Sequence, residues 1–555
     1  MIPPGLLSRH PEVDVGWVVR VPLRGRRTRA WITGVGVQPP EGVDLSEVTR
    51  ISGHGPPPAI VDLASWASER WVGPRPRFLR TATATRNIAR VEPRRVEPPA
   101  AGLELPLIGE ALRHRLSVVR VPPSLSDSDI ARTALSRGRG LVLVPSIDRA
   151  RALRRDLSRA GATVAMYPDD WALSAGGVTT VGVRSAAWAP VGELDVVVVI
   201  DEHDEAYQEE SAPTWNARDV AAHRALSARV PCVMTSPVPS LDSLHRARLV
   251  LPSRSEERRG WPILEVIDRR RDDPRAGQWC SPRLARIVTS DRKVACVINR
   301  KGRARILVCS GCGELATDGH GRPLAQEGED LVSVTDGTRR PVVCEHCGST
   351  RFRRSRIGVS GVGAELEALA GRPVVEITAD TSTIPEAGLY VGTEALLHRL
   401  HPADGIEVVV FLDIDQELLA PRYRSGEETL ALVTRAARLV GPRAGGGRIA
   451  VQTRLPHHRV IDALLHSDPG RFAGAEMMAR TELELPPAVA MAMISGAGAP
   501  EFVARLGSPP GVTVMGPDEG RWLVKAPDHH TLSAVLKGVR RPPGRLRIAV
   551  DPLRA

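Results

Sequence analysis

The sequence predicts an α/β protein with two lobes, each built on a parallel sheet. Two series of Val- and Ile-rich runs alternate with helical or polar segments along the 555 residues of the chain. Because near-continuous apolar runs are typical of strands buried on both faces, they favour parallel sheets covered by helices. At roughly 100–200 residues per domain, the length leaves room for several domains besides a single lobe.

Residues 1–80 are predicted to form a small β-rich domain. The expected elements are two β-like runs at 17–22 and 29–37, separated by a basic turn, and a helix at 61–72. Residues 81–115 are rich in Arg and Pro. Because repeated Pro interrupts both helices and sheet ladders, this segment is interpreted as a linker.

The first lobe is placed at residues 116–258 and the second at 259–305 and 353–455. The strands expected in the first lobe are 117–121, 140–146, 163–167, 179–183, 195–201 and 231–236. Those expected in the second are 293–299, 373–378, 388–393, 407–415 and 448–453. A cysteine-rich insertion at 306–352 interrupts the second lobe, and residues 456–555 are expected to form a C-terminal α/β domain.

The chain is strongly basic, with a formal net charge of +11 and a sequence pI near 9.9. This balance favours a polyanionic partner such as nucleic acid. There is no uninterrupted apolar run of about 18 residues and no signal-peptide pattern at the start, so we expect a cytoplasmic protein without a membrane partner. The first lysine is Lys293, so a phosphate loop that needs a lysine cannot precede it.

Four of the seven cysteines form two CxxC pairs, Cys309 with Cys312 and Cys344 with Cys347. Two such knuckles can supply the four thiolates of a closed tetrahedral zinc site, one zinc per chain. Each pair is followed by a glycine, which allows the tight turn that aims backbone N–H groups at sulfur. The alternative is two unrelated pairs of structural or redox cysteines.

The run DVVVVIDEHDEAY predicts a buried strand that ends in Asp201, Glu202 and His203. Such folds bind ligands at the carboxyl edge of the sheet. In nucleotide motors a strand-terminal Asp reaches Mg²⁺ through water and the next Glu polarises the attacking water. The alternative is a solvated acidic strand end.

Several segments resemble the primosomal protein N′ (PriA) replication-restart helicase family. They occur in the family's order, from about residue 16 to 553: VGVRSAAWAPVGELDVVVVIDEHDEAYQEESAPTWNARDVAAHRA, TSPVPSLDS, INRKGRARILVCSGC, CEHCGST, GTEALLHRL, FLDIDQELLAPRYRSGEE and VDPLR. The resemblance implies two RecA-like helicase lobes with a zinc-knuckle insertion. It also implies that residues 1–80 are a shortened form of the family's domain for the 3′ end of DNA.

The family's phosphate loop is replaced by VPPSLSDSD at residues 121–129. This segment has no Gly and no Lys, its two Pro lack amide donors, and its two Asp repel phosphate. The arginine motif of the second lobe corresponds to RAARLVGPRAGGG, where Arg438 or Arg443 could mimic an arginine finger. We therefore expect a pseudo-helicase to which ATP does not bind, with Asp201, Glu202 and His203 vestigial and no catalytic residue.

Candidate DNA contacts are clustered arginines, which can neutralise phosphates. The arginines are Arg24, Arg26, Arg27 and Arg29 near the N-terminus and Arg351, Arg353, Arg354 and Arg356 after the second knuckle. Tyr207 and Trp215 lie where the family has an aromatic-rich loop that senses single strands, so they are candidates for base stacking. The alternatives are a solvated basic face and core packing of the rings.

The resemblance implies a replication-restart, primosome-assembly protein. It would recognise stalled or abandoned forks and help to reload the replicative helicase without helicase activity of its own. Its partners would be branched or single-stranded DNA, primosome and helicase-loading proteins and a single-strand-binding protein, in a nucleoid-associated location. Two alternatives stay open: an active ATP-dependent 3′–5′ DNA helicase, and a zinc-stabilised general nucleic-acid-binding protein.

Overall fold

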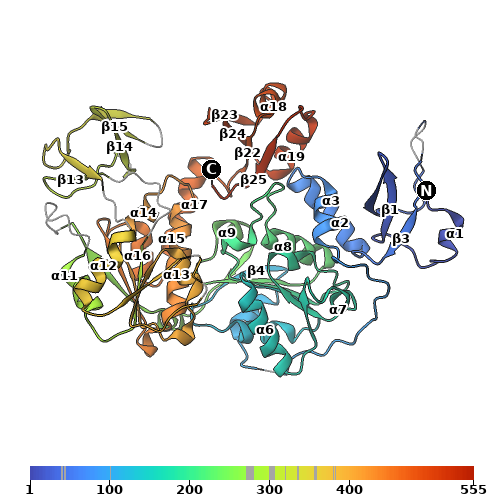
Figure 1. The fold of residues 1–555 in the computed structure, drawn as a ribbon, viewed down its shortest axis with the longest axis horizontal. Coiled ribbons are helices and arrows are strands. Elements are labelled where there is room, and N and C mark those ends of the chain that lie inside the picture. Colours follow the sequence, from blue (N-terminus) through green and yellow to red (C-terminus); the bar gives the residue numbers. More distant parts are fainter. Residues whose placement is uncertain are drawn as a thin grey trace.

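The computed structural model describes residues 1–38, 42, 45–100, 102–270, 280–298, 307–318, 321–333, 337–354, 359–378, 380–381 and 383–554. Two α/β lobes lie side by side, with the N-terminal sheet at one end of the molecule and a small cysteine-containing module at the other (Figure 1). None of the described helices combines the length and apolar character needed to cross a bilayer.

The first lobe contains a seven-stranded, all-parallel sheet in the order β10-β4-β9-β8-β5-β7-β6. Its strands are β4 (Leu116–Arg120), β5 (Gly140–Leu143), β6 (Val164–Tyr167), β7 (Thr179–Gly182), β8 (Val196–Ile200), β9 (Cys232–Ser236) and β10 (Arg248–Val250). Its helices are α4 (Pro106–Ala111), α5 (Asp127–Leu135), α6 (Ile147–Arg159), α7 (Trp171–Ala175), α8 (Ala217–Ala228), α9 (Leu241–Arg246) and α10 (Arg254–Gly260). The six predicted strands are all present, whereas β10, a short edge strand with two exposed residues, was not predicted.

The second lobe contains a six-stranded parallel sheet in the order β11-β21-β20-β12-β19-β18. The strands are β11 (Ile263–Asp268), β12 (Val294–Val297), β18 (Val374–Ile377), β19 (Leu389–Gly392), β20 (Val408–Phe411) and β21 (Arg448–Thr453). The helices are α11 (Pro282–Val288), α12 (Val359–Ala370), α13 (Glu394–Arg399), α14 (Asp415–Leu418) and α15 (Ser425–Val440). The two-lobed α/β fold predicted from the apolar runs is therefore confirmed.

The N-terminal segment is divided between two cores. The antiparallel strands β1 (Val18–Leu23), β2 (Arg26–Trp31) and β3 (Arg50–Gly53), preceded by α1 (Pro4–Leu7), enclose a small core around Trp17. In contrast, α2 (Pro58–Arg70) and α3 (Arg75–Thr81) pack into the core of the first lobe. The second run predicted as a strand, 29–37, corresponds to β2, which begins at Arg26 and ends at Trp31.

The C-terminal segment is divided in the same way. Helices α16 (Arg459–Leu465) and α17 (Gly470–Glu482) contribute Val460, Ile461 and Phe472 to the core of the second lobe. The antiparallel sheet that follows, in the order β23-β24-β22-β25, joins the core of the first lobe instead. It consists of β22 (Ala490–Ser495), β23 (Thr513–Asp518), β24 (Arg521–Ala526) and β25 (Arg547–Val550), with α18 (Ala499–Leu506) and α19 (His529–Gly538).

The cysteine insertion contains two small antiparallel sheets. Strands β13 (Leu307–Cys309) and β17 (Phe352–Arg354) pair with each other and close the base of the insertion. Between them lies a three-stranded meander of β14 (Leu324–Glu327), β15 (Asp330–Ser333) and β16 (Arg339–Pro341). We refer to residues 307–354, as far as they are described, as the cysteine module.

Candidate metal centre and inter-lobe cleft

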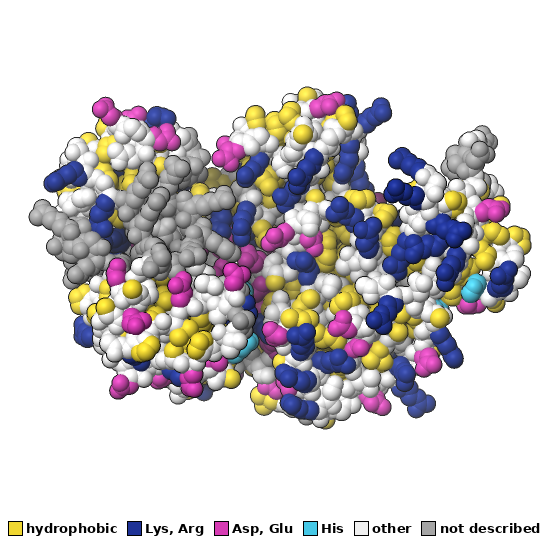
Figure 2. Space-filling view, viewed as in Figure 1, with side chains coloured by type: hydrophobic (Ala, Val, Ile, Leu, Met, Phe, Trp, Pro, Cys, Tyr) yellow, Lys and Arg dark blue, Asp and Glu magenta, His cyan; other side chains and the backbone are white. Residues whose placement is uncertain are grey.

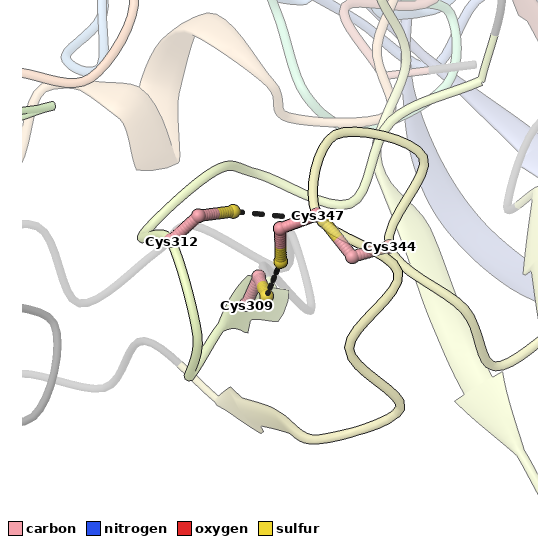
Figure 3. A group of neighbouring side chains, drawn as sticks. All are labelled: Cys309, Cys312, Cys344 and Cys347. Carbon is pink, nitrogen blue, oxygen red and sulfur yellow. Dashed lines mark hydrogen bonds between the residues drawn. The ribbon is translucent and has the colours of Figure 1, made fainter.

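The two CxxC pairs converge on one point of the cysteine module (Figure 3). The Sγ atoms of Cys309 and Cys347 lie 3.5 Å apart, those of Cys312 and Cys344 lie 3.6 Å apart, and all four lie within 4.8 Å of one another. Four sulfurs at 2.3 Å from a tetrahedral zinc would be separated by about 3.8 Å. The arrangement therefore fits a four-thiolate metal site, and no other candidate metal cluster is found in the described part of the chain.

The backbone around the knuckles favours negative charge on sulfur. Gly311 donates its N–H to Cys309 Sγ at 3.3 Å, and Gly313 and Gly348 adopt φ values of +79° and +73°, as the predicted tight turns require. Although burial would raise it, backbone N–H groups and a neighbouring thiol lower the pKa of Cys309 to about 6. Burial and the neighbouring sulfurs raise the pKa of Cys312 to about 12, because a second thiolate would lie beside the first. Four thiolates this close together repel one another, so a cation is needed to keep all four deprotonated.

A small apolar core supports the cysteine module between its two knuckles. Leu324 and Leu331 of the meander pack with Leu307, Ala316 and the partly buried Phe352. The module is attached to the second lobe through Leu419, which packs on Val308 and Leu315. In addition, the Arg454 guanidinium donates to the carbonyl of Gly313, beside the first knuckle. His320, in the segment between the knuckles, lies outside the described residues.

Asp201 lies at the carboxyl end of β8, where the first lobe faces the second. Its carboxylate is only 3% exposed, and each oxygen accepts a hydrogen bond from a different arginine: Oδ2 from Arg149 at 2.6 Å and Oδ1 from Arg438 at 2.5 Å. Although burial alone would raise it, these two guanidinium groups lower the pKa of Asp201 below its usual value. The alternative of a solvated acidic strand end is therefore wrong for Asp201, whose carboxylate is buried and bonded to two arginines.

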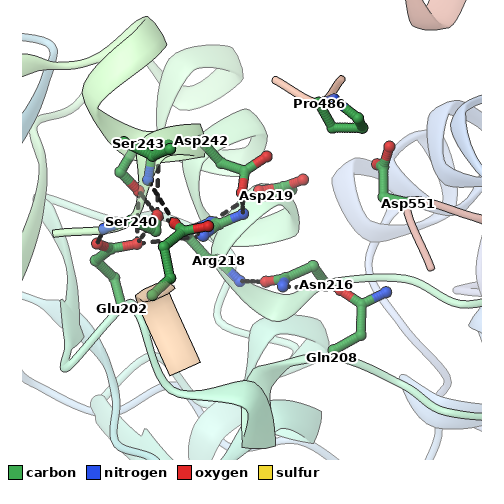
Figure 4. A network of polar contacts seen from close by, with 12 residues as sticks. Glu202, Gln208, Asn216, Arg218, Asp219, Ser240, Asp242, Ser243, Pro486 and Asp551 are labelled. Atoms are coloured by element: carbon green, nitrogen blue, oxygen red, sulfur yellow. Dashed lines mark hydrogen bonds and ion pairs between the residues drawn. The ribbon is translucent and has the colours of Figure 1, made fainter. Parts of the chain in front are cut away.

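Glu202 points the other way, into a buried polar network of the first lobe (Figure 4). It is 1% exposed and accepts hydrogen bonds from the Ser240 N–H at 2.7 Å, the Ser240 hydroxyl at 2.7 Å and the Ser243 hydroxyl at 2.6 Å. The buried Arg218 pairs with the same carboxylate at 3.3 Å. The side chain of Glu202 is thus saturated by contacts within its own lobe, and these connect β8 to α8 and α9.

The side chain of His203 also has a hydrogen-bond partner within the first lobe. Its Nδ1 lies 2.7 Å from the hydroxyl of Ser236 at the end of β9. Burial lowers the pKa of His203 despite the adjacent carboxylates of Asp201 and Asp204, so the neutral ring is favoured near pH 7. The three residues expected as a vestigial motor motif therefore all have structural partners.

Tyr207 and Trp215 do not present their rings to solvent, which corrects the expectation that they stack on bases. Tyr207 is fully buried and its hydroxyl donates to the carbonyl of Ile200 at 2.6 Å. Trp215 is 5% exposed and packs edge-on against Trp188, which in turn contacts Phe78 of α3. Both rings belong to the core of the first lobe, which is the alternative of core packing considered for them.

The predicted arginine clusters lie at opposite ends of the molecule (Figure 1). Arg24, Arg26 and Arg27 are exposed on the β1–β2 hairpin, whereas Arg29 is half-buried and donates to the carbonyl of Ala84. In the cysteine module, Arg351 is exposed and Arg353 half-buried, while Arg356 and the side chain of Arg354 lie outside the described residues.

Two further arginines, Arg20 and Arg80, lie close to Arg29 of the N-terminal cluster. Neither was predicted from the sequence as part of that cluster. Burial, and then the positive charges of Arg20 and Arg80, lower the pKa of Arg29. Arg20 comes from β1 and Arg80 from α3. Among the described residues no carboxylate forms an ion pair with any of these three. Figure 2 shows Lys and Arg side chains gathered on the side of the molecule where the N-terminal sheet meets the first lobe.

Comparison with curated proteins finds relatives that are named replication restart protein PriA. The chain is 26% identical to that of Bacillus subtilis over 345 residues, which cover 57% of this chain and 43% of the relative. It is 30% identical to the probable replication restart protein PriA of Mycobacterium leprae over 430 residues, covering 67% of this chain and 64% of the relative. The chain thus spans about half the length of the relatives it matches. No protein-family model matches it.

Solved structures with a similar arrangement include a Saccharomyces cerevisiae Dbp5 variant bound to RNA and ADP BeF3. Its identity to this chain is 11%, its TM-score is 0.37, and the match covers 68% of this chain and 94% of that one. The Escherichia coli DEAH/RHA helicase HrpB matches with 14% identity and a TM-score of 0.31, over 63% of this chain and 42% of its own. These likenesses are too distant to inform function.

Proposed function

Because the chain belongs to the PriA family of replication restart proteins, we propose that it binds branched or single-stranded DNA and serves in replication restart. It would act at stalled or abandoned forks as a scaffold for primosome and helicase-loading proteins and for a single-strand-binding protein. Its contribution would be binding rather than ATP-driven unwinding.

The observation that carries this proposal is the uncompensated cluster of Arg20, Arg29 and Arg80. Most arginines in the cleft between the lobes are neutralised by carboxylates, whereas these three have no ion-pair partner among the described residues. Burial and the neighbouring charges of Arg20 and Arg80 lower the pKa of Arg29. An anion stabilises such a group of like charges, and a nucleic-acid backbone supplies regularly spaced anions.

The separation of the two candidate arginine clusters supports a branched rather than a linear partner. The β1–β2 hairpin and the cysteine module lie at opposite ends of the long axis (Figure 1). A molecule with exposed arginines at both ends, on the hairpin and at Arg351 of the module, can contact two arms of a fork at once. Contacts to phosphate would carry the affinity, and this geometry would carry the preference for a fork.

Zinc is the metal that we propose for the cysteine module. Tetrahedral sites made of four thiolates are typical of zinc, or of iron–sulfur chemistry. Cys309, Cys312, Cys344 and Cys347 would hold the ion, which would be structural because no ligand position is left open.

Removing the exposed arginines of the hairpin should weaken DNA binding and reduce its salt dependence. In the variant Arg24→Ala/Arg26→Ala/Arg27→Ala, each lost phosphate contact should reduce the slope of log K against log salt by ~0.9 on duplex or ~0.7 on single strands. Fluorescence anisotropy at several salt concentrations, with forks, duplex, single strands and RNA, measures both quantities. Fork affinity should fall more than duplex affinity.

The matched control removes three arginines from the outer face of α6, in the variant Arg151→Ala/Arg155→Ala/Arg159→Ala. All three are exposed, and this variant changes the net charge equally. It should bind DNA as the wild type does. Equal affinity of the wild type for fork, duplex and RNA would contradict a role at forks and favour a general nucleic-acid-binding protein.

We further expect no ATP turnover, with or without DNA. The loop that would cradle phosphates carries Asp127, whose carboxylate accepts two hydrogen bonds from Arg149, and Asp201 is saturated by arginines. Phosphate release should stay at the background of the assay, and Mg-ATP should leave the melting temperature unchanged. DNA-stimulated hydrolysis that is lost in Asp201→Asn would identify an active motor instead.

A further inference from the structure

Two arginines of the second lobe reach the carboxyl edge of the first lobe's sheet. Arg438, on α15, donates to Asp201 Oδ1 and, at 2.9 Å, to the carbonyl of Pro123. One turn earlier on the same helix, Arg435 donates to Asp204 Oδ2 at 3.0 Å. The crevice outside the carboxyl ends of parallel strands is where α/β folds bind their ligands. Here the chain's own guanidinium groups enter that crevice.

The first lobe adds a positive charge of its own at the same point. Arg149, on α6, donates to both oxygens of Asp127, at 2.8 and 2.7 Å, and also to Asp201. Asp127 begins α5, so its carboxylate lies at the helix N-terminus, a position that otherwise attracts phosphate. With both Asp201 oxygens bonded to arginines, a divalent cation there would meet two guanidinium groups.

The loop before α5 also packs closely against the end of α10. Gly260, the last residue of α10, lies so close to it that a Cβ at this position would come within 2.2 Å of Pro122 Cβ and 2.8 Å of the Ser124 hydroxyl. Proline lacks an N–H, so Pro122 and Pro123 have no amide donor to offer an anion. Neither charge nor space at this loop favours a triphosphate.

Three more polar contacts join the lobes around the same cleft. Arg424 pairs with Asp242 at 2.8 Å, and the Leu241 N–H donates to Glu427 Oε1 at 3.0 Å. Arg120, at the end of β4, pairs with Asp468 in the α16–α17 connection at 3.1 Å. Together with Arg435 and Arg438 they connect both lobes on several sides of a cavity of about 480 Å³.

We propose that these contacts are a built-in latch, which holds the two lobes closed without any nucleotide. In hinged two-lobed proteins a ligand usually supplies the contacts that favour the closed form. Here Arg438 supplies such a contact to Asp201, and Arg149 of the first lobe binds the other oxygen of the same carboxylate, where a metal and phosphates would otherwise be needed. The lobes then form one fixed platform rather than a cycling motor. This inference concerns lobe closure alone and does not depend on whether the protein binds DNA.

The test compares the full-length wild type with the variant Arg435→Ala/Arg438→Ala by small-angle X-ray scattering and hydrogen exchange. The wild type should have the same radius of gyration with and without millimolar Mg-ATP. The variant should have a larger radius of gyration, and amides of α15 and of residues 121–129 should exchange about tenfold faster or more. Asp201→Asn removes the negative charge to which Arg438 is bonded, so it should also increase the radius of gyration and accelerate exchange.

The matched control is Arg459→Ala/Arg471→Ala, which removes two exposed arginines from the second lobe outside the cleft and should leave both measurements at wild-type values. Circular dichroism and metal content report whether each variant is folded. If the double variant is unfolded, Arg438→Lys replaces it. This substitution keeps the charge but loses the planar fork whose two nitrogens bond Asp201 and the Pro123 carbonyl separately, so it should still accelerate exchange. A folded variant with wild-type scattering and exchange, or a wild type that compacts on adding Mg-ATP, would overturn the latch.

Discussion

Replacing Cys344 with Ser should abolish metal binding and unfold most of the cysteine module. A closed four-thiolate site contributes folding free energy, with apparent values of about 10–16 kcal/mol for structural zinc in small finger peptides. The module has only a few apolar residues in its own core, so it cannot replace that contribution. Elemental analysis should fall from one zinc per chain to near zero, and amides of the described residues 307–354 should lose their protection from exchange.

The control for this variant is Cys280→Ser, which removes a thiol outside the cluster. It should retain one zinc per chain and the protection of the module. Because the module contacts the second lobe chiefly through Leu419 and Arg454, the rest of the lobe should stay folded in Cys344→Ser. Intact wild-type protein that contains no zinc, or two zinc ions, would contradict the single-site assignment.

Replacing Glu202 with Ala should destabilise the first lobe strongly rather than remove an activity. The change leaves Arg218, the Ser240 N–H and two hydroxyls without their shared acceptor in a buried site. Removing one partner of a buried ion pair costs about 3–5 kcal/mol. For a lobe of this size the melting temperature should fall on the order of 10 °C, which differential scanning calorimetry measures.

Two further variants separate this structural role from a catalytic one. Glu202→Gln keeps an oxygen that can accept from the Ser240 N–H, so it should cost less, about 1–3 kcal/mol. Glu205→Ala removes an exposed carboxylate three residues away and should be nearly neutral. If Glu202→Ala melted like the wild type but lost an ATP turnover that the wild type possessed, Glu202 would be a catalytic carboxylate and the buried network would be incidental.

Several features were predictable because they depend on residues close together in the chain. Except for the partly exposed β10 and β11 at the sheet edges, the strands of both lobes follow from Val- and Ile-rich runs, since burial on both faces leaves a local apolar signature. The four cysteines follow from two short knuckles whose spacing matches metal coordination. The missing glycines and lysine of the loop at 121–129 are likewise visible in the sequence itself.

Other features depend on which distant residues the topology brings together. Arg438 and Asp201 are separated by 237 positions, and nothing in either local pattern selects the other as its partner. The burial of Trp215 involves α3, more than a hundred residues earlier, because Phe78 of α3 packs on Trp188 and Trp188 packs on Trp215. In the same way, α2 and α3 join the first lobe and α16 and α17 the second, although their sequences place them in terminal domains.

The physical reason is that hydrophobic periodicity specifies that a face will be buried but not what will cover it. The sequence likewise does not determine the role of a charged side chain, because that role depends on whether an opposite charge lies within a few ångströms in the folded chain. By itself, therefore, the sequence determined the two-lobed sheets, the two CxxC pairs that form the cysteine cluster, and the absence of glycine and lysine from residues 121–129. Only the tertiary structure decided that the strand-terminal acids are occupied by arginines, one of them from the opposite lobe, and that the arginines of the N-terminal sheet and α3 are left without acidic partners.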